Sequence, residues 1–367
     1  MKTKTIRAFG AAALAALYLG LAAFAWLREA DAVSEAERRK LAQMPQLSVS
    51  SVLSGSFMAG FEDYSLDQFP LRDGFRGLKS RFHYAIGQLD NNGIYITDGY
   101  AAKVEYPLDG SSVDRALGLF RSIYDTYLRE AGCTVLASVV PDKGCYLARE
   151  NGYLSLDYDA LTQQVREGMP YAYYVNLFDT LTLADYYRTD THWRQEALLG
   201  AAAALCDALG VTAPQAEDYT QVAAERPFYG VYHGQAALPM EPDTLVMLQS
   251  GLLDRCAVRN PITGAETAVY DTEKLSGRDM YDVFLSGAQA LLTIENPDAE
   301  TDRELVIFRD SFGSAIAPLL VQGYKTVTLV DIRYIASEQL GAYLDFSGKD
   351  VLFLYSTQVL NNSTALK

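Results

Sequence analysis

The stretch that most constrains the fold is an apolar run that ends abruptly in turn residues, ELVIFRDSFG at residues 304–313. A short apolar run beside turn residues is typical of a strand buried on both faces of a sheet. Residues 314–322 then carry a helical pattern. A strand, a sharp turn that holds a serine and a helix form the layout of a nucleophile elbow, which presents the hydroxyl at the carboxyl end of the strand.

Ser311 is the candidate nucleophile of this elbow. The backbone N–H groups of Phe312 and Gly313 open the following helix, and the positive end of its dipole suits a developing oxyanion. A second interpretation is open at this point. Asp310 and Ser311 also suit the common role of capping the helix, without any part in catalysis.

The rest of the chain alternates apolar strands with amphipathic helices. Such alternation predicts a mostly parallel sheet flanked by helices. An amphipathic helix is expected after Ser111 or Ser112, one of which caps its start. Its apolar face consists of Val113, Leu117, Phe120, Tyr124 and Leu128. Residues 91–99 predict a hairpin with Asp98-Gly99 as its turn. The remaining expected elements are strands at about 133–140, 172–177, 304–308, 325–331 and 350–355, and helices at about 157–168, 194–209 and 314–322.

The domain organisation follows from composition shifts along the chain. Residues 1–29 predict a membrane anchor, because basic residues precede about twenty apolar ones. A cleavable signal with Ala23-Phe24-Ala25 near its cleavage site is the alternative, and either places the remainder outside the cytoplasm. Residues 30–90 predict a helical stalk, helix-prone from residue 30 to 40. Residues 91–367 predict one α/β domain with a small β-rich insertion at about 213–300.

Charge and composition exclude several kinds of partner and site. The net charge of −15 argues against nucleic acid. Three histidines do not support a histidine-rich metal site. The four cysteines include no C-x-x-C pair, so one or two disulfides and free buried thiols both remain open.

A second motif, DTHW at residues 190–193, lies just before the predicted helix at 194–209. Asp190 and His192, two residues apart in an extended or tightly turned segment, place a carboxylate beside an imidazole. The carboxylate then orients the ring and stabilises its charged form, while the far ring nitrogen faces a nucleophile. In the alternative, Asp190 or Thr191 caps the helix and His192 packs there.

Together, DTHW and the later Asp-Ser pair at the elbow resemble the extracytoplasmic alginate O-acetyltransferases. The chain is more similar still to the family named for its D-H-H-W motif, in the same SGNH-hydrolase-like group. The likeness covers most of the chain after the amino-terminal apolar run. Further segments resemble the family in the family's order: RRKLA at 38–42 with Pro45, DQFPLRD at 67–73, VPDK at 140–143, DIRY at 331–334 and Leu354-Tyr355 in the last strand.

This resemblance implies a Ser–His–Asp site, with Ser311 as nucleophile, His192 as general base and Asp190 as the group that orients it. It implies an SGNH-hydrolase-like (flavodoxin-like) α/β fold, and we expect no cofactor and no metal. Two positions depart from the family. Thr191 stands at the second letter of D-H-H-W, as in the alginate enzymes. Residues 286–288 read Ser-Gly-Ala where relatives usually carry Gly-Gly-Asn.

The missing asparagine bears on the oxyanion site. If it supplies a donor in the relatives, its loss costs about 10²–10³ in rate, unless Gln289 replaces it. Arg309 suits the binding of a carboxylate-bearing sugar or an acyl group, or else a salt bridge to a neighbouring acid. Lys143, at the carboxyl end of a predicted strand, either faces the cleft or is a solvated loop lysine.

Four other residues are candidates near the site. Arg333 and Tyr334 are expected to support it from the adjacent strand rather than to react. Tyr187 and Trp193 flank the Asp–His pair and suit stacking on a sugar. Core packing is the expected alternative for Trp193.

These features predict an extracytoplasmic O-acetyltransferase, anchored at the membrane, that modifies a cell-surface or secreted polysaccharide. By resemblance, a membrane-bound O-acyltransferase partner supplies the acetyl groups. A carbohydrate acetylesterase with the same triad is one alternative, since exclusion of water from the acyl-enzyme separates the two activities. A non-catalytic polysaccharide-binding or scaffold protein with a decayed site is the other, and Ala288 favours it.

Overall fold

The computed structural model describes residues 2–34 and 36–367, so Met1 of the predicted anchor and Glu35 of the predicted stalk lie outside it. Contacts within the chain define two compact units. The first comprises the residues up to Asn91 together with Gly234–Pro239, and the second comprises Asn92–His233 and Met240–Lys367.

The amino-terminal unit consists mainly of helices. Its first helix, α1 (Lys2–Leu27), contains a segment, Thr5–Ala25, that is long and apolar enough to cross a membrane. Its role as an anchor stays a prediction. Three shorter helices follow: α2 (Val49–Leu53), α3 (Ser56–Asp67) and α4 (Arg72–Ala85).

The segment between α1 and α2 differs from the helix-prone stalk that the sequence predicts over residues 30–40. It forms a short antiparallel pair of strands, β1 (Val33–Ser34) and β2 (Arg39–Lys40). Glu37, in the turn between these strands, lies 3.1 Å from the guanidinium of Arg76 on α4. Contacts with residues distant in the sequence therefore decide the conformation here, and they override a weak local preference for helix.

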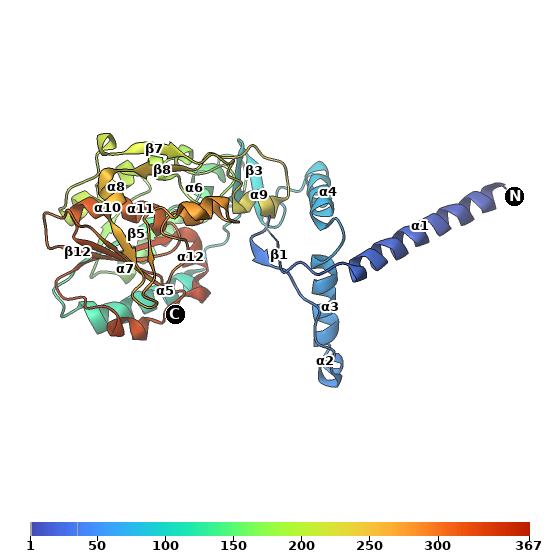
Figure 1. The fold of residues 1–367 in the computed structure, drawn as a ribbon, viewed down its shortest axis with the longest axis horizontal. Coiled ribbons are helices and arrows are strands. Elements are labelled where there is room, and N and C mark those ends of the chain that lie inside the picture. Colours follow the sequence, from blue (N-terminus) through green and yellow to red (C-terminus); the bar gives the residue numbers. More distant parts are fainter. Residues whose placement is uncertain (1, 35) are drawn as a thin grey trace. The chain divides into compact units, whose positions relative to one another are not determined.

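The second unit is built on an eight-stranded sheet with the strand order β10-β9-β11-β13-β12-β14-β5-β6 (Figure 1). Five neighbouring strands are mutually parallel, which confirms the predicted mostly parallel sheet. They are β13 (Thr326–Val330), β12 (Glu304–Arg309), β14 (Asp350–Ser356), β5 (Thr134–Val140) and β6 (Tyr173–Val175).

Helices cover both faces of this sheet, as the sequence predicts. Side chains of α8 (Leu199–Leu209) and α11 (Gly313–Leu320) share one apolar cluster with the strands. Side chains of α5 (Gly110–Ile123) and α7 (Tyr158–Gly168) share the other. Residues of β12 alternate between these two clusters, so the strand is buried on both sides and its carboxyl end is rigidly placed.

The predicted β-rich insertion at about 213–300 is in part an extension of the main sheet. β11 (Leu291–Glu295) runs antiparallel to β13, and β9 (Ala257–Arg259) pairs with β11. Without β11, the backbone N–H and C=O groups along one side of β13 would form an exposed sheet edge. The pairing with β11 covers this edge. The other strands of the region are β10 (Glu266–Thr267), which pairs with β9, and the separate pair β7 (Thr220–Ala223) and β8 (Val246–Gln249).

Several element boundaries differ from the sequence prediction by a few residues. Asp109 caps α5 by accepting the Ser112 N–H at 3.0 Å, whereas Ser111 or Ser112 was expected to be the cap. The helix predicted from residue 194 begins as a 3-10 turn at Gln195–Ala197 and continues as α8. The predicted hairpin is present as β3 (Ile94–Thr97) and β4 (Tyr100–Lys103).

The four cysteines are free thiols. Of the two alternatives that the sequence leaves open, free thiols are therefore present and disulfides are not. Cys206 and Cys256 are buried, and Cys133 and Cys145 are partly exposed. Cys206 and Cys256 behave as small apolar residues of the core.

Candidate active site

The predicted elbow joins β12 to α11 at the carboxyl end of the sheet. Ser311 lies in the turn between Arg309, the last residue of the strand, and Gly313, the first of the helix. A Cβ at position 313 would lie 2.7 Å from the Cβ of Arg309, so a glycine is needed for the chain to turn this tightly.

Ser311, His192 and Asp190 form one hydrogen-bonded chain. The His192 Nε2 lies 2.8 Å from the Ser311 Oγ. The His192 Nδ1 lies 2.6 Å from the Asp190 Oδ1. Asp190 is fully buried and His192 nearly so, whereas Ser311 is partly exposed. The arrangement can hold the ring with its proton on Nδ1 and leave Nε2 to accept the serine proton.

The Asp190 carboxylate is fixed by more than the imidazole. One oxygen also accepts the backbone N–H of His192 at 3.1 Å, and the other accepts the N–H of Val231 at 2.8 Å. The residue before Val231 is Gly230, where a Cβ would lie 2.3 Å from the Asp190 Cα. Residues 230–231 belong to the region that the sequence predicts as an insertion, and no motif in it indicated this contact.

A second residue from that region, Tyr281, holds the histidine ring. The two rings are parallel within 7°, and their centroids are 3.8 Å apart. Phe312 contacts the same imidazole with a centroid distance of 5.0 Å. A buried aromatic ring stacked on an imidazole restricts the rotation of the imidazole. Tyr281 is therefore a positioning residue that the sequence motifs did not reveal.

Three of the predicted substrate-binding residues are buried and do not face an open cleft. Lys143 donates hydrogen bonds to the carbonyls of Tyr187 at 2.8 Å and Arg188 at 3.1 Å. Burial lowers the pKa of Lys143 to about 7. The Tyr187 ring packs edge-on against Phe228 in the core, and Trp193 donates its indole N–H to the Phe312 carbonyl at 3.1 Å. Packing, the alternative expected for Trp193, describes both aromatic residues.

The Arg309 guanidinium is also buried, and the salt-bridge alternative applies to it. Its Nη1 lies 3.8 Å from Asp331, and burial lowers its pKa. The Asp310 carboxylate accepts the Phe312 N–H at 3.0 Å and the Ser356 N–H at 2.8 Å, which ties the end of β12 to the end of β14.

The predicted oxyanion donors are engaged within the turn itself. The Phe312 N–H donates to the Asp310 carboxylate, as described above, and the Gly313 N–H donates to the Asp310 carbonyl at 3.1 Å. Neither N–H is free for an oxyanion in this conformation. The Gln289 side-chain carbonyl accepts a hydrogen bond from the Asn260 side chain at 3.1 Å, and a role for the Gln289 amide as the replacement donor stays a prediction.

Arg333 and Tyr334 lie just past the end of β13. Arg333 binds the Asp331 carboxylate through Nε at 2.9 Å and Nη2 at 2.6 Å. Its guanidinium lies 5.6 Å from the centre of the Tyr334 ring, which is exposed. Arg333 therefore shares Asp331 with Arg309, and the role of Arg333 and Tyr334 in supporting the site stays a prediction.

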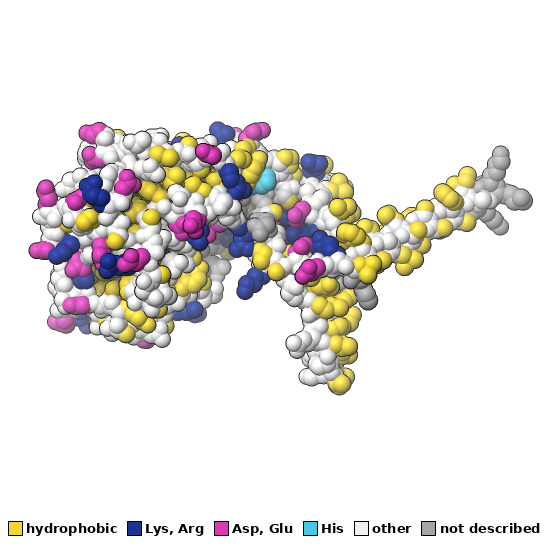
Figure 2. All heavy atoms as spheres, viewed as in Figure 1, with side chains coloured by type: hydrophobic (Ala, Val, Ile, Leu, Met, Phe, Trp, Pro, Cys, Tyr) yellow, Lys and Arg dark blue, Asp and Glu magenta, His cyan; other side chains and the backbone are white. Residues whose placement is uncertain are grey.

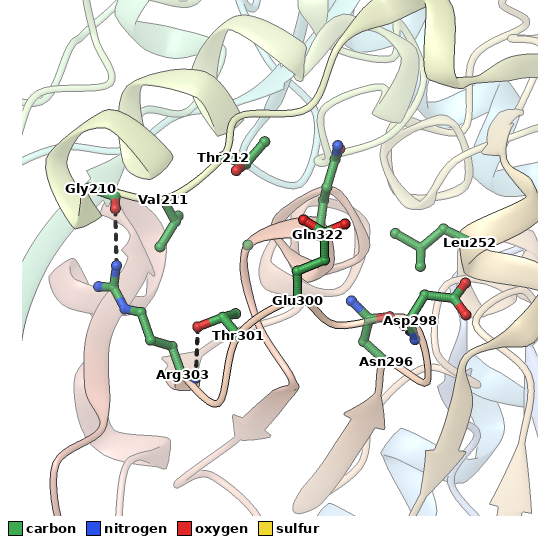
Figure 3. A pocket seen from close by; sticks show the side chains of 11 residues that line it. Gly210, Val211, Thr212, Leu252, Asn296, Asp298, Glu300, Thr301, Arg303 and Gln322 are labelled. Atoms are coloured by element: carbon green, nitrogen blue, oxygen red, sulfur yellow. Dashed lines mark hydrogen bonds between the residues drawn. The ribbon is translucent and has the colours of Figure 1, made fainter.

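A separate cavity of about 760 Å³ lies at the amino end of β12 (Figure 3). Arg303, which precedes β12, lines it and donates to the Gly210 carbonyl at 3.0 Å and the Leu209 carbonyl at 2.8 Å. Asn296 donates to two further carbonyls. These polar groups have partners within the protein, and nothing in the cavity indicates a ligand.

Residues 2–34 and 36–367 contain no group of three His, Cys, Asp or Glu side chains placed to hold a metal ion.

The family model for DHHW proteins matches residues 163–330, the segment that holds Asp190, His192 and Ser311. The predicted resemblance to the DHHW family is confirmed. A DHHW family protein from Eubacterium siraeum DSM 15702 has a solved structure similar to this one, with a TM-score of 0.60 and 22% identity over 75% of this chain and 94% of that chain.

Two further solved structures are similar at lower identity. Bacillus cereus PatB1 with a sulfonyl adduct aligns with a TM-score of 0.60 and 17% identity, over 73% of this chain and 95% of its own. The O-acetyltransferase domain of Pseudomonas putida AlgJ aligns with a TM-score of 0.47 and 15% identity, over 74% and 92%. Likeness at these identities concerns the fold alone. No curated protein matches the sequence significantly.

The second letter of the DHHW motif, Thr191 in this chain, has a defined role in holding the motif. Its hydroxyl donates to the Gln358 side chain at 3.0 Å and accepts from the Tyr232 hydroxyl at 3.0 Å. Gln358 donates to Tyr232 at 2.6 Å, which closes a ring of three hydrogen bonds. A threonine at this position therefore fixes the turn between Asp190 and His192 without the second histidine.

The Gly230→Ala variant tests whether the contact with Asp190 positions the site. The added methyl group must displace the Asp190 backbone, and a displacement of the order of 1 Å can cost about 10²-fold in rate. We expect kcat/KM for an aryl acetate to fall by roughly this factor while the circular dichroism spectrum is retained. Gly118→Ala, on an open face of α5 with no atom within 4 Å of the new Cβ, is the matched control. Equal activity in the two variants would contradict the assignment.

The buried Lys143 predicts a pH dependence of stability. Its pKa is lowered from 10.5 to about 7, so between these values the unfolded chain binds one more proton than the folded chain. The unfolding free energy of the unaltered chain should therefore rise with pH over this range, by roughly a few kcal/mol, relative to Lys143→Met. Urea denaturation at several pH values measures the difference. A difference that stays constant from pH 7 to 10.5 would show that Lys143 is not held in a desolvated site.

Proposed function

We propose that this protein is a membrane-anchored extracytoplasmic O-acetyltransferase that modifies a polysaccharide through an acyl-enzyme on Ser311. The observation that carries the proposal is the continuous hydrogen-bonded chain from Ser311 through His192 to the buried Asp190. A serine, a histidine and an aspartate linked in this order are the parts needed for nucleophilic acyl transfer.

In the first half-reaction, His192 Nε2 accepts the Ser311 proton as Oγ attacks the carbonyl carbon of an acetyl donor. The tetrahedral intermediate collapses when the donor's leaving group departs with the proton that His192 returns to it, and an acetyl ester of Ser311 remains. Asp190 keeps the Nδ1 proton in place and stabilises the imidazolium that forms between these steps.

The second half-reaction reverses the same geometry. A sugar hydroxyl gives its proton to His192 and attacks the acetyl-serine carbonyl, and Ser311 leaves with the proton that His192 donates back. The product is an acetylated sugar, and the free serine is regenerated. Because water is a smaller nucleophile than a sugar hydroxyl, transfer also requires that bound acceptor exclude water from the acyl-enzyme.

The acetyl group and the polysaccharide acceptor rest on the sequence resemblance to the alginate O-acetyltransferases and the DHHW family. The anchored location rests on α1, whose segment Thr5–Ala25 is long enough to span a bilayer. An extracytoplasmic enzyme needs acetyl groups carried across the membrane, and we propose a membrane-bound O-acyltransferase as their source.

A second candidate, a polysaccharide-binding protein with a decayed site, is favoured by a specific observation. Ala288 has no side-chain donor where relatives carry Asn, and the N–H groups of Phe312 and Gly313 are occupied. Weak oxyanion stabilisation would slow acyl transfer by about 10²–10³ for each missing donor. Direct assay of the serine separates this candidate from an enzyme.

The test is labelling and turnover of the full chain in detergent. A sulfonyl fluoride should leave a sulfonyl adduct on one serine, identified as Ser311 by peptide mass; the PatB1 structure also carries a sulfonyl adduct. Hydrolysis of an aryl acetate should fall by about 10⁴ in Ser311→Ala and in His192→Ala. The matched control is Ser363→Ala, which should retain activity. Ser363 is a buried serine on a 3-10 turn, far from Ser311 in the sequence.

The same assay with an added oligosaccharide distinguishes the activities. A transferase yields acetylated sugar at the expense of free acetate, and an esterase releases acetate at the same rate with or without the sugar. A chain that is neither labelled nor active but retains polysaccharide affinity would contradict the enzymatic proposal and establish the binding role.

A further inference from the structure

The helix α4 (Arg72–Ala85) carries an apolar stripe that the proposed chemistry does not use. The stripe continues one residue before the helix and into the turn after it, at spacings of three and four residues. Within the helix, this spacing places Phe75, Leu78 and Phe82 on one face. Leu71 precedes the helix, and Ile86 and Leu89 follow it on either side of Gly87, whose φ is 87°. All six are exposed, and the least exposed, Phe75, is at 47%. They are Leu71, Phe75, Leu78, Phe82, Ile86 and Leu89.

The opposite face of α4 is held by the chain segment Gly234–Pro239 of the same unit. Ser80 donates to the Ala236 carbonyl at 2.8 Å, and Arg76 donates to the Gly234 carbonyl at 2.8 Å. Ser80 is fully buried. The helix is therefore fixed by its polar face, and this attachment leaves the apolar stripe directed away from its support.

Basic side chains border the stripe. With about 3.6 residues per turn, Lys79 falls on one border and Arg81 on the other, and both are exposed. The helix carries four basic residues and one acid, Asp73, in a chain whose net charge is −15. An apolar face with basic borders, on a helix of low overall hydrophobicity, is typical of helices that lie in the interface of a bilayer.

Neighbouring helices extend the exposed apolar surface. Figure 2 shows hydrophobic side chains gathered along one side of α2 and α3. The large apolar residues exposed there are Val49, Val52, Leu53, Met58 and Leu66. An apolar surface spread over three consecutive helices exceeds the scattered exposure that is normal for a soluble protein.

We infer that the apolar stripe of α4 lies in the interfacial layer of the membrane, with Lys79 and Arg81 bound to anionic lipid headgroups. The inference rests on the part of the proposed function that places α1 across the same membrane. Because α4 belongs to the same compact unit as α1, the bilayer is an apolar partner within reach of the stripe. The basic borders complement anionic lipids and would not favour a second copy of an acidic chain.

The test is photocrosslinking of the full chain in vesicles of phosphatidylcholine with a minority of phosphatidylglycerol. A benzophenone amino acid replaces Phe82 in one variant and Asp73 in the matched control. Asp73 lies on the same helix but on the opposite side, and its side chain is 67% exposed. We expect light to give a lipid adduct at position 82 in several-fold higher yield than at position 73. The variant K79E/R81E should lower the yield at position 82.

Three results would overturn the inference: equal lipid yields at the two positions, a covalent dimer in place of the lipid adduct, or no adduct at position 82. A covalent dimer would assign the stripe to a second copy, and the absence of any adduct would show that position 82 does not lie in the lipid. Resistance of the chain to alkaline extraction from the vesicles shows independently whether α1 is inserted. The readout involves no acyl transfer, so failure of this inference and failure of the proposed acetyltransferase are separate outcomes.

Discussion

The buried carboxylate of Asp190 is the interaction on which the candidate site depends. A buried charge without partners is costly, and here the two carboxylate oxygens accept three N–H groups, two from His192 and one from Val231. These bonds leave the carboxylate a single orientation. The imidazole inherits that orientation, and stacking on Tyr281 prevents the ring from turning away from Ser311.

The sheet supplies the other half of the geometry. Ser311 is placed by the end of β12, a strand buried on both faces, and Asp310 ties this end to Ser356 at the end of β14. The Trp193 indole reaches the Phe312 carbonyl, so the segment that carries Asp190 and His192 is joined directly to the serine turn. The Asp190–His192 segment and Ser311 are far apart in the sequence, and the distance between them is therefore set by the folded sheet.

The sequence was sufficient to predict the parts of the molecule that follow from local pattern. Continuous apolar runs such as residues 305–308 indicated buried parallel strands, and motifs indicated Asp190, His192 and Ser311. It could not predict Val231 or Tyr281 at the site, because their roles depend on how a long irregular region folds back over the sheet. The sequence of this region predicts short strands and turns, but it has no hydrophobic periodicity that would indicate where they pack on the sheet.

The direction of long side chains was also beyond the sequence. Lys143 lies just past the end of β5 and Arg309 ends β12, at the edge where ligands bind in such folds. Both side chains nevertheless turn inward, Lys143 toward backbone carbonyls and Arg309 toward Asp331. The position of a residue relative to a strand predicts the sheet edge at which it lies. It does not predict which neighbouring groups bind its charged side chain. Likewise, the helix-prone residues near Glu37 became a β turn because Arg76, distant in the sequence, pairs with that carboxylate.

The central claim is that Ser311 and His192 act as one catalytic unit, and a double-mutant comparison tests it most directly. The measurement is kcat/KM for an aryl acetate in Ser311→Ala, His192→Ala and the variant that combines them. Residues that act as a unit are non-additive, so the double variant should be no slower than the slower single variant. Losses that multiply in the double variant would contradict the claim, because each side chain would then act independently of the other.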